Sequence, residues 1–169
     1  MRRTLPWLVC LALLSPAAPS AADKPAPCKA AEFRQFDFWI GDWEVHAPDG
    51  SLAGTNRIDS ILDGCGLQEN WAGAKGLTGT SLNTYDAPRR VWHQTWIDSQ
   101  GGVLLLEGAL RAGSMVLSGT SPAQAGGTIT DRITWSRLDG GDVRQLWEQS
   151  KDGGRTWSVG FDGRYTRKR

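Results

Sequence analysis

Apolar and polar residues alternate along most of the chain beyond residue 40, in short runs separated by turn-forming residues. The turn signals lie at residues 47–50, 63–66, 72–76, 86–90, 99–102, 111–114, 121–127, 139–141 and 151–155. They divide the chain into about ten strands, which should pair with their neighbours as antiparallel hairpins. A meander of this many strands buries its apolar face best by closing on itself. The pattern predicts an all-β fold, a single antiparallel up-and-down β-barrel over residues 30–169.

The alternation also predicts which side chains point into the barrel, because residues i and i+2 of a strand share a face. Along residues 128–136, Ile129, Ile133 and Trp135 share one face, while Arg132 and the threonines take the other. The same parity groups Leu67 with Glu69 and Trp71, Trp92 with Gln94, Trp96 and Asp98, and Val143 with Gln145 and Trp147.

These inward rows mix tryptophans with polar side chains. A solid core would exclude Glu69, Gln94 and Gln145, since a buried polar group without a partner costs about 1–3 kcal/mol. A cavity for a small molecule removes this conflict, because such sites combine apolar walls with a few polar groups. Alternatively, the polar side chains bond to one another or lie in solvent at the barrel ends. The predicted ligand-binding residues are Glu69, Trp71, Trp92, Gln94, Trp96, Trp135, Gln145 and Trp147.

The N-terminal residues have the pattern of a secretory signal peptide. Arg2 and Arg3 precede an apolar run over residues 5–14, and small residues lead to a cleavage site after Ala22. The run is too short to span a bilayer, and Cys10 lies inside it, where a lipid-anchored cysteine is not expected. Residues 1–22 are therefore predicted to direct the protein to the periplasm or the outside, with no transmembrane segment.

Residues 23–29 are predicted to form a tether between the cleavage site and the barrel domain. Residues 30–38 favour a short helix, in which the spacing of Phe33 and Phe36 continues to Trp39 and suits a plug at one barrel end. Cys28 and Cys65 are the cysteines of the exported chain, so an oxidising compartment favours a disulfide between them. Two separate buried thiols are the alternative.

Charge and motifs exclude several classes of function. The net charge of +1 argues against a nucleic-acid partner. The chain has no G-x-S-x-G, H-E-x-x-H, P-loop or G-x-G-x-x-G motif, so we assign no catalytic residue. Its two histidines, His46 and His93, lie in different strands, the first beside a turn and the second facing outward, and no metal site is expected. The oligomeric state is left open.

Ser150, Asp152, Gly154 and Trp157 match the Asp-box pattern S-x-D-x-G-x-x-W. In such a box the Ser and Asp side chains bond to turn amides, the Gly takes a positive φ and the aromatic ring packs under the hairpin. A β-propeller would need repeats of this unit, and the chain has one copy. We therefore interpret these four residues as a structural hairpin staple.

Five segments carry a resemblance to a known family: FDFWIGDWEV (36–45), ILDGCGLQENW (61–71), VWHQTWIDSQG (91–101), ITWSRLDGGDVRQLWEQSKDGGRTW (133–157) and FDGRYTRK (161–168). Together they resemble a family of secreted bacterial proteins of unknown function with a lipocalin-like domain, within the calycin superfamily. The resemblance implies that Trp43, in the Gly-x-Trp of the first strand, is capped by Arg164 or Arg167 of the last strand, which closes the barrel base.

Two departures from related families limit what carries over. Nitrobindin-type calycins bind haem through a late histidine, and nothing after His93 can take that part, so no cofactor is expected. Fatty-acid-binding proteins hold a carboxylate with an Arg-x-Tyr pair. Here Arg164 and Tyr165 are adjacent and face opposite ways, so carboxylate capture by that pair does not carry over.

Three functions are compatible with the sequence. The first is a periplasmic or secreted protein that binds a small apolar or aromatic molecule in a Trp-lined cavity. The second is an enzyme in which Glu69 or Glu148 acts as general acid or base beside Arg132 or Arg144, although Glu148 and Arg144 should face outward and pair on the surface. The third is a filled structural or interaction barrel. The volume of the barrel interior separates the third from the other two.

Overall fold

The computed structural model describes residues 27–123 and 126–168, so the predicted signal peptide and most of the tether lie outside the described residues. The predicted ten-stranded antiparallel barrel is confirmed: each strand pairs with the next in the chain, and β1 pairs with β10 to close the barrel. The strands are β1 (Gly41–His46), β2 (Leu52–Ile61), β3 (Gly66–Gly73), β4 (Thr78–Asp86), β5 (Val91–Asp98), β6 (Val103–Arg111), β7 (Ser114–Pro122), β8 (Thr128–Arg137), β9 (Val143–Ser150) and β10 (Ser158–Arg167). Each predicted turn overlaps a connection between two consecutive strands.

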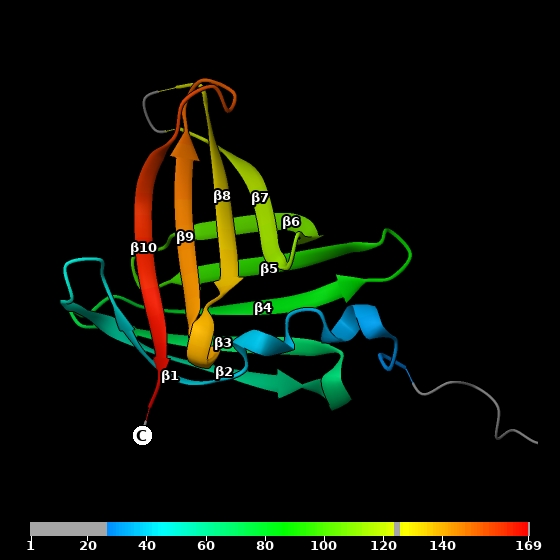
Figure 1. Cartoon of the computed structure of the whole chain (residues 1–169). Helices are drawn as coiled ribbons and strands as arrows, with labels where there is room; N and C mark the ends of the chain where they lie inside the picture. Colours follow the sequence, from blue (N-terminus) through cyan, green and yellow to red (C-terminus); the bar gives the residue numbers. More distant parts are fainter. Residues whose placement is uncertain (1–26, 124–125, 169) are drawn as a thin grey trace, which may run out of the picture.

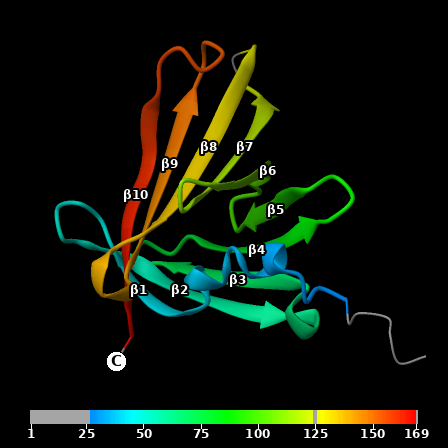
Figure 2. The same cartoon turned by 45° about the vertical axis from the view of Figure 1, so that its right-hand side comes forward.

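The two halves of the barrel cross steeply. Strands β8–β10 stand almost upright in Figure 1, whereas β2–β5 run across the view, and Figure 2 shows the same crossing from another side. Such a crossing follows from the right-handed twist of adjacent strands, which accumulates around a closed sheet. The β9–β10 connection lies at the top of both views.

The N-terminal segment covers the other end of the barrel. The helix predicted over residues 30–38 consists of two 3₁₀ turns, η2 (Ala31–Arg34) and η3 (Asp37–Trp39), beside β3 and β4 in Figure 1. A segment this short forms too few hydrogen bonds to stabilise an α-helix. The tighter 3₁₀ turns bring Phe36 and Trp39 inward. Both side chains are completely buried. The Phe36 ring centroid lies 5.1 Å from that of Trp135 and 5.6 Å from that of Trp92.

A disulfide ties this segment to the barrel wall. Cys28 and Cys65 are bonded, with their Cα atoms 4.9 Å apart, which confirms the predicted pair. Cys65 follows the turn η4 (Leu62–Gly64), between β2 and β3. The Arg34 guanidinium also donates a hydrogen bond to the carbonyl oxygen of Gly64. The plug is therefore attached to the barrel at the β2–β3 connection as well as through β1.

The closed end is built around Trp43. Its indole is completely buried, and Nε1 donates a 2.9 Å hydrogen bond to the carbonyl oxygen of Trp39. The Arg167 guanidinium lies 4.1 Å from the centroid of the Trp43 ring, so the expected cap from the last strand is present. Arg164 does not share this role: it faces outward and donates a 2.9 Å hydrogen bond to Asp142. Among the described residues, the structure holds no helix long and apolar enough to cross a membrane.

The Gly-x-Trp motif has a direct geometric reason. Gly41 has φ +147°, and a Cβ atom at this position would collide with Nη1 of Arg167. The guanidinium passes over the glycine backbone to reach the indole of Trp43. Glycine at position 41 thus allows both the positive φ and the observed path of the guanidinium.

Candidate ligand cavity

The barrel interior is filled at its closed end and hollow beyond it. The hollow part is a cavity of about 420 Å³, lined by strands β3, β5, β6, β7, β8, β9 and β10 and by residues of the β3–β4 and β5–β6 turns. The structure therefore does not support a filled barrel. Six of the eight predicted ligand-binding residues line the cavity: Glu69, Trp71, Gln94, Trp96, Gln145 and Trp147.

Trp92 and Trp135 are absent from the cavity lining, which differs from the position expected for ligand-binding residues. Both are buried in the core of the closed end. Trp92 Nε1 donates a 3.1 Å hydrogen bond to Oε1 of Gln35, and the Trp135 ring packs 5.3 Å from that of Trp39. Alternation predicted correctly that both side chains point inward. It says nothing about where along the barrel axis an inward side chain lies.

Aromatic side chains form much of the cavity wall. Trp71, Trp96, Trp147 and Phe161 line it, and the Trp71 and Phe161 rings meet edge to face with centroids 5.9 Å apart. Trp147 Nε1 donates a 2.8 Å hydrogen bond to Oδ1 of Asp131, which holds the ring in one orientation. The polar edge of that indole is thus satisfied within the protein, and its apolar surface can face a ligand.

Glu69 lies on the polar side of the cavity and is only 4% exposed. Its Oε1 accepts a 2.7 Å hydrogen bond from Nδ2 of Asn56, and its Oε2 accepts one of 2.7 Å from Oγ of Ser81. Burial raises the pKa of Glu69 from 4.5 to about 7, and the two hydrogen bonds oppose the shift only in part. The Glu69 carboxyl group therefore changes charge near neutral pH.

The network extends around Glu69 through neutral side chains. Asn83 donates to Ser81 over 2.9 Å, and Gln94 Nε2 donates to Oδ1 of Asn83 over 2.8 Å. On the other side, the Tyr165 hydroxyl donates to Oε1 of Gln145. Burial, and then the charge of Glu69, raise the pKa of Tyr165 well above its usual value. Glu69, Gln94 and Gln145 do not bond one another directly, but each has a polar side-chain partner and each also lines the cavity.

Asp131 is a cavity residue that the sequence prediction missed. It is 2% exposed, and its Oδ1 accepts hydrogen bonds from Trp147 and from Nε2 of Gln149, the latter over 2.9 Å. The sequence pattern could have identified it, because Asp131 lies two residues before Ile133 in β8 and therefore points to the same face. Phe161 and Tyr165 of β10 also line the cavity and were not predicted as ligand residues.

The acid and base candidates outside the cavity are surface pairs. Glu148 and Arg144 both face outward, as expected, but the predicted pair between them is wrong: Glu148 bonds Arg132 at 3.0 Å, and Arg144 bonds Asp162 at 2.7 Å. Residues i and i+4 of one strand lie roughly 13 Å apart, whereas neighbours on adjacent strands are in contact distance. Glu148, Arg132 and Arg144 therefore take no part in cavity chemistry.

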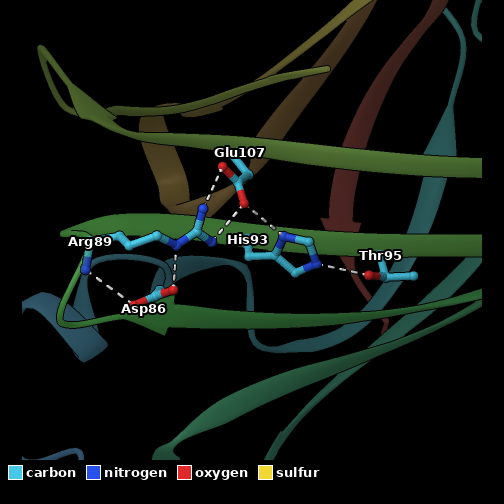
Figure 3. A network of polar contacts seen from close by, with 5 residues as sticks. All are labelled: Asp86, Arg89, His93, Thr95 and Glu107. Carbon is cyan, nitrogen blue, oxygen red and sulfur yellow. Dashed lines mark hydrogen bonds and ion pairs between the residues drawn. The ribbon is translucent and has the colours of Figure 1, made fainter. Parts of the chain in front are cut away.

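His93 belongs to a polar network on the outer surface, as Figure 3 shows. Its Nε2 lies 2.9 Å from Oγ1 of Thr95, and its Nδ1 lies 3.4 Å from Oε1 of Glu107. Arg89 joins the same Glu107 to Asp86, with contacts of 2.7 Å and 2.6 Å. This network links the β4–β5 turn to β6, and the expected outward orientation of His93 is correct.

The Asp box forms the predicted staple between β9 and β10. Ser150 Oγ accepts a 2.8 Å hydrogen bond from the amide of Gly154, which has φ +87°. Asp152 accepts from the Thr156 amide at 2.9 Å, and the hydrogen bonds from Thr156 lower its pKa to about 2. The Trp157 indole bonds the carbonyl oxygen of Gly154 at 3.0 Å. These contacts are internal to the hairpin and support a structural role.

The described residues contain no group of three or more His, Cys, Asp or Glu side chains that could hold a metal ion. Comparison of the chain with protein-family models and with curated proteins found no match. The resemblance to secreted lipocalin-like proteins therefore stays a prediction, and the function must be argued from the cavity itself.

Proposed function

We propose that the protein binds a small apolar or aromatic molecule in the barrel cavity. One observation carries this proposal: a cavity of about 420 Å³ has Trp71, Trp96, Trp147 and Phe161 in its wall. Cavities of several hundred Å³ with mainly apolar walls are typical of small-molecule sites. Indole rings offer large, rigid apolar surfaces. Little side-chain conformational entropy is therefore lost when a flat or aliphatic ligand packs against them.

The polar side of the cavity supports a ligand with at least one polar group. Glu69, Gln94 and Gln145 are already held by hydrogen bonds within the barrel, so they present fixed donors and acceptors. A fixed polar group selects among ligands because an analogue without the matching group leaves it unpaired. These residues would orient the ligand while the aromatic wall supplies most of the contact area.

We also propose that the protein acts in the periplasm or outside the cell. The signal-peptide pattern of residues 1–22 supports this location, as does the Cys28–Cys65 disulfide, since disulfides persist in oxidising compartments. The contact of Arg167 with Trp43 agrees with the closure expected from the lipocalin-like resemblance. This contact supports membership of that secreted family.

Native mass spectrometry of the protein purified from its own host tests the proposal, because a retained molecule would appear as a mass adduct. In parallel, neutral aromatic alcohols and lipids should raise the melting temperature by mass action and change indole fluorescence. Leu104→Trp is the blocking variant, because Leu104 lines the cavity. Leu105→Trp is its control, since the neighbouring Leu105 is 60% exposed on the outer face.

Leu104→Trp should abolish these responses and Leu105→Trp should keep them. If no adduct forms and the panel changes neither melting nor fluorescence, the binding proposal is wrong.

The raised pKa of Glu69 favours a second candidate function, an enzyme in which Glu69 acts as general acid or base on the bound molecule. A carboxyl group that titrates near 7 can both accept and donate a proton at neutral pH. A bound molecule that is converted by the wild type and bound but unconverted by Glu69→Gln would support this candidate. Unchanged turnover in Glu69→Gln would exclude it.

A further inference from the structure

The cavity presents negative charge without positive charge. Its lining includes the carboxyl groups of Glu69, Asp98 and Asp131, and no Lys, Arg or His of the described residues lines it. From this asymmetry we propose that the ligand is a cation: a small amine whose ammonium group lies against Asp131 and whose apolar or aromatic body lies among the tryptophans. The inference rests on the proposed binding function and specifies the chemical class of its ligand.

Asp131 is the residue that most requires a cation. It is 98% buried, since only 2% of it is exposed, and its two hydrogen-bond donors, Trp147 and Gln149, are both neutral. Its Oδ2 accepts no hydrogen bond from the residues that the structure describes. This oxygen is therefore open to a cationic donor, and a charge-assisted hydrogen bond is stronger than a neutral one. An ammonium group in the cavity would supply both the missing donor and the missing charge.

The arginine next in sequence cannot supply that charge. Arg132 points to the outer face of β8, where it bonds Glu148 at 3.0 Å and stacks 3.9 Å from the ring centroid of Trp157. A side chain on the opposite face of the same strand is separated from Asp131 by the sheet itself. No basic side chain of the described residues therefore lies beside Asp131 in the cavity.

The aromatic wall favours the same class of ligand. The faces of Trp71, Trp96 and Trp147 carry partial negative charge, and ammonium groups bind such faces more strongly once water is excluded. Trp147 is held by its hydrogen bond to Asp131, so one ring and one carboxylate meet at a single point of the wall. This combination of carboxylate and indole suits an ammonium group.

The other two acids strengthen this preference. Asp98 accepts a 2.9 Å hydrogen bond from the Gly102 amide, and this bond is the main cause of its lowered pKa, so the group stays ionised. Glu69 carries a negative charge once it is ionised, and that charge repels an anion. Arg164, which a carboxylate ligand would need, faces outward and is bonded to Asp142. The structure thus selects against acidic ligands, such as fatty acids.

Three probes of nearly equal shape test the proposal: 4-phenylbutylamine, 4-phenyl-1-butanol and 4-phenylbutyrate. They differ mainly in charge, which is positive, zero and negative at pH 7. Isothermal titration calorimetry on the purified exported protein should show the amine binding at least about tenfold more tightly than the alcohol. 4-Phenylbutyrate should bind most weakly of the three.

Asp131→Asn should lower the affinity for the amine at least about tenfold and change the affinity for the alcohol by no more than about twofold. The reason is that Asn keeps an acceptor oxygen for Trp147 and Gln149 but loses the charge. Glu148→Gln, which changes an acid on the outer face of β9, is the control and should leave all three affinities unchanged. If Asp131→Asn does not fold, the ratio of amine to alcohol affinity in the wild type decides the question alone.

Equal affinities for amine and alcohol in the wild type would overturn the cation proposal while leaving the binding function intact. Binding of none of the three, together with an empty native mass spectrum and no response to the wider panel, would overturn both. If 4-phenylbutyrate binds most tightly of the three probes, the carboxylates of the cavity do not set its charge preference, and the proposal is rejected.

Discussion

Glu69 is a buried carboxylic acid whose side-chain partners, Asn56 and Ser81, are neutral. Burial raises its pKa from 4.5 to about 7, so the folded protein holds this proton more tightly than the unfolded chain does. The resulting contribution to stability is fully present below pH 4.5 and is lost as the pH rises through 7. A shift of this size corresponds to roughly 3 kcal/mol.

Glu69→Gln should therefore flatten the pH dependence of stability. The neutral amide can accept from Asn56 and donate to Ser81, and it has no charge to bury. We expect the wild type to lose roughly 3 kcal/mol of unfolding free energy between pH 4.5 and 8, and the variant to lose much less. Urea denaturation at a series of pH values measures this, with Glu148→Gln as the surface control. Identical slopes in wild type and Glu69→Gln would show that another group titrates.

Gly41 and Arg167 are expected to be coupled, because the guanidinium passes over the glycine to reach Trp43. Gly41→Ala should cost about 1–3 kcal/mol, through the clash with Arg167 and the positive φ. Arg167→Ala should cost about 0.5–1 kcal/mol, through loss of the cation–π contact. In a double-mutant cycle, Gly41→Ala should be less harmful when Arg167 is already Ala. Strictly additive effects would contradict this geometry.

At the scale of elements, the segment from Cys28 to Trp39 depends on its two attachments for its conformation. Its 3₁₀ turns are too short to be stable alone. The disulfide closes a loop with a sequence separation of 37, and the buried rings of Phe36 and Trp39 hold the segment from the inside. The plug should therefore loosen when either attachment is removed.

Replacing both Cys28 and Cys65 with Ser should lower the unfolding free energy by up to roughly 4 kcal/mol, because the open chain regains loop entropy when it unfolds. Thermal denaturation with and without a reductant measures the effect. The reductant should lower the melting temperature of the wild type and leave that of the double variant unchanged. Labelling of both thiols shows that the reductant has opened the disulfide. An unchanged melting temperature of the wild type under those conditions would refute the prediction.

At the scale of the whole molecule, closure of the barrel is a long-range event. Strands β1 and β10 pair over four residue pairs, from Trp43 with Arg167 to His46 with Arg164. This pairing joins residues about 120 positions apart, whereas every other strand pair joins neighbours in the chain. Loop-closure entropy makes such a contact a late step in folding.

Val45→Ala in the closing strand should therefore speed unfolding and leave refolding almost unchanged. Val45 is fully buried opposite Tyr165, so its truncation should cost roughly 2 kcal/mol. Leu117→Ala, in the hairpin of β7 and β8, should instead slow refolding, because that hairpin forms locally. Stopped-flow chevron plots of the two variants make the comparison. If Val45→Ala slows refolding as much as Leu117→Ala does, closure is not late.

The sequence alone determined the strands, the turns, the closed barrel and the face of each inward row, because alternation and turn chemistry are local properties of the chain. Asp131 could also have been found in this way, from its parity with Ile133. The Cys28–Cys65 pair followed from there being two cysteines beyond the predicted signal peptide, and Arg167 over Trp43 from a resemblance between motifs.

The position of each side chain along the barrel axis, and its partners across strands, follow from the three-dimensional packing of the strands. Trp92 and Trp96 share one face of β5, yet the first packs in the closed end and the second lines the cavity. Glu148 pairs with Arg132 of the neighbouring strand instead of Arg144 of its own. Both outcomes depend on the stagger between adjacent strands and on the depth to which the N-terminal plug fills the barrel. Stagger and depth are relations between distant segments, and no single strand encodes them.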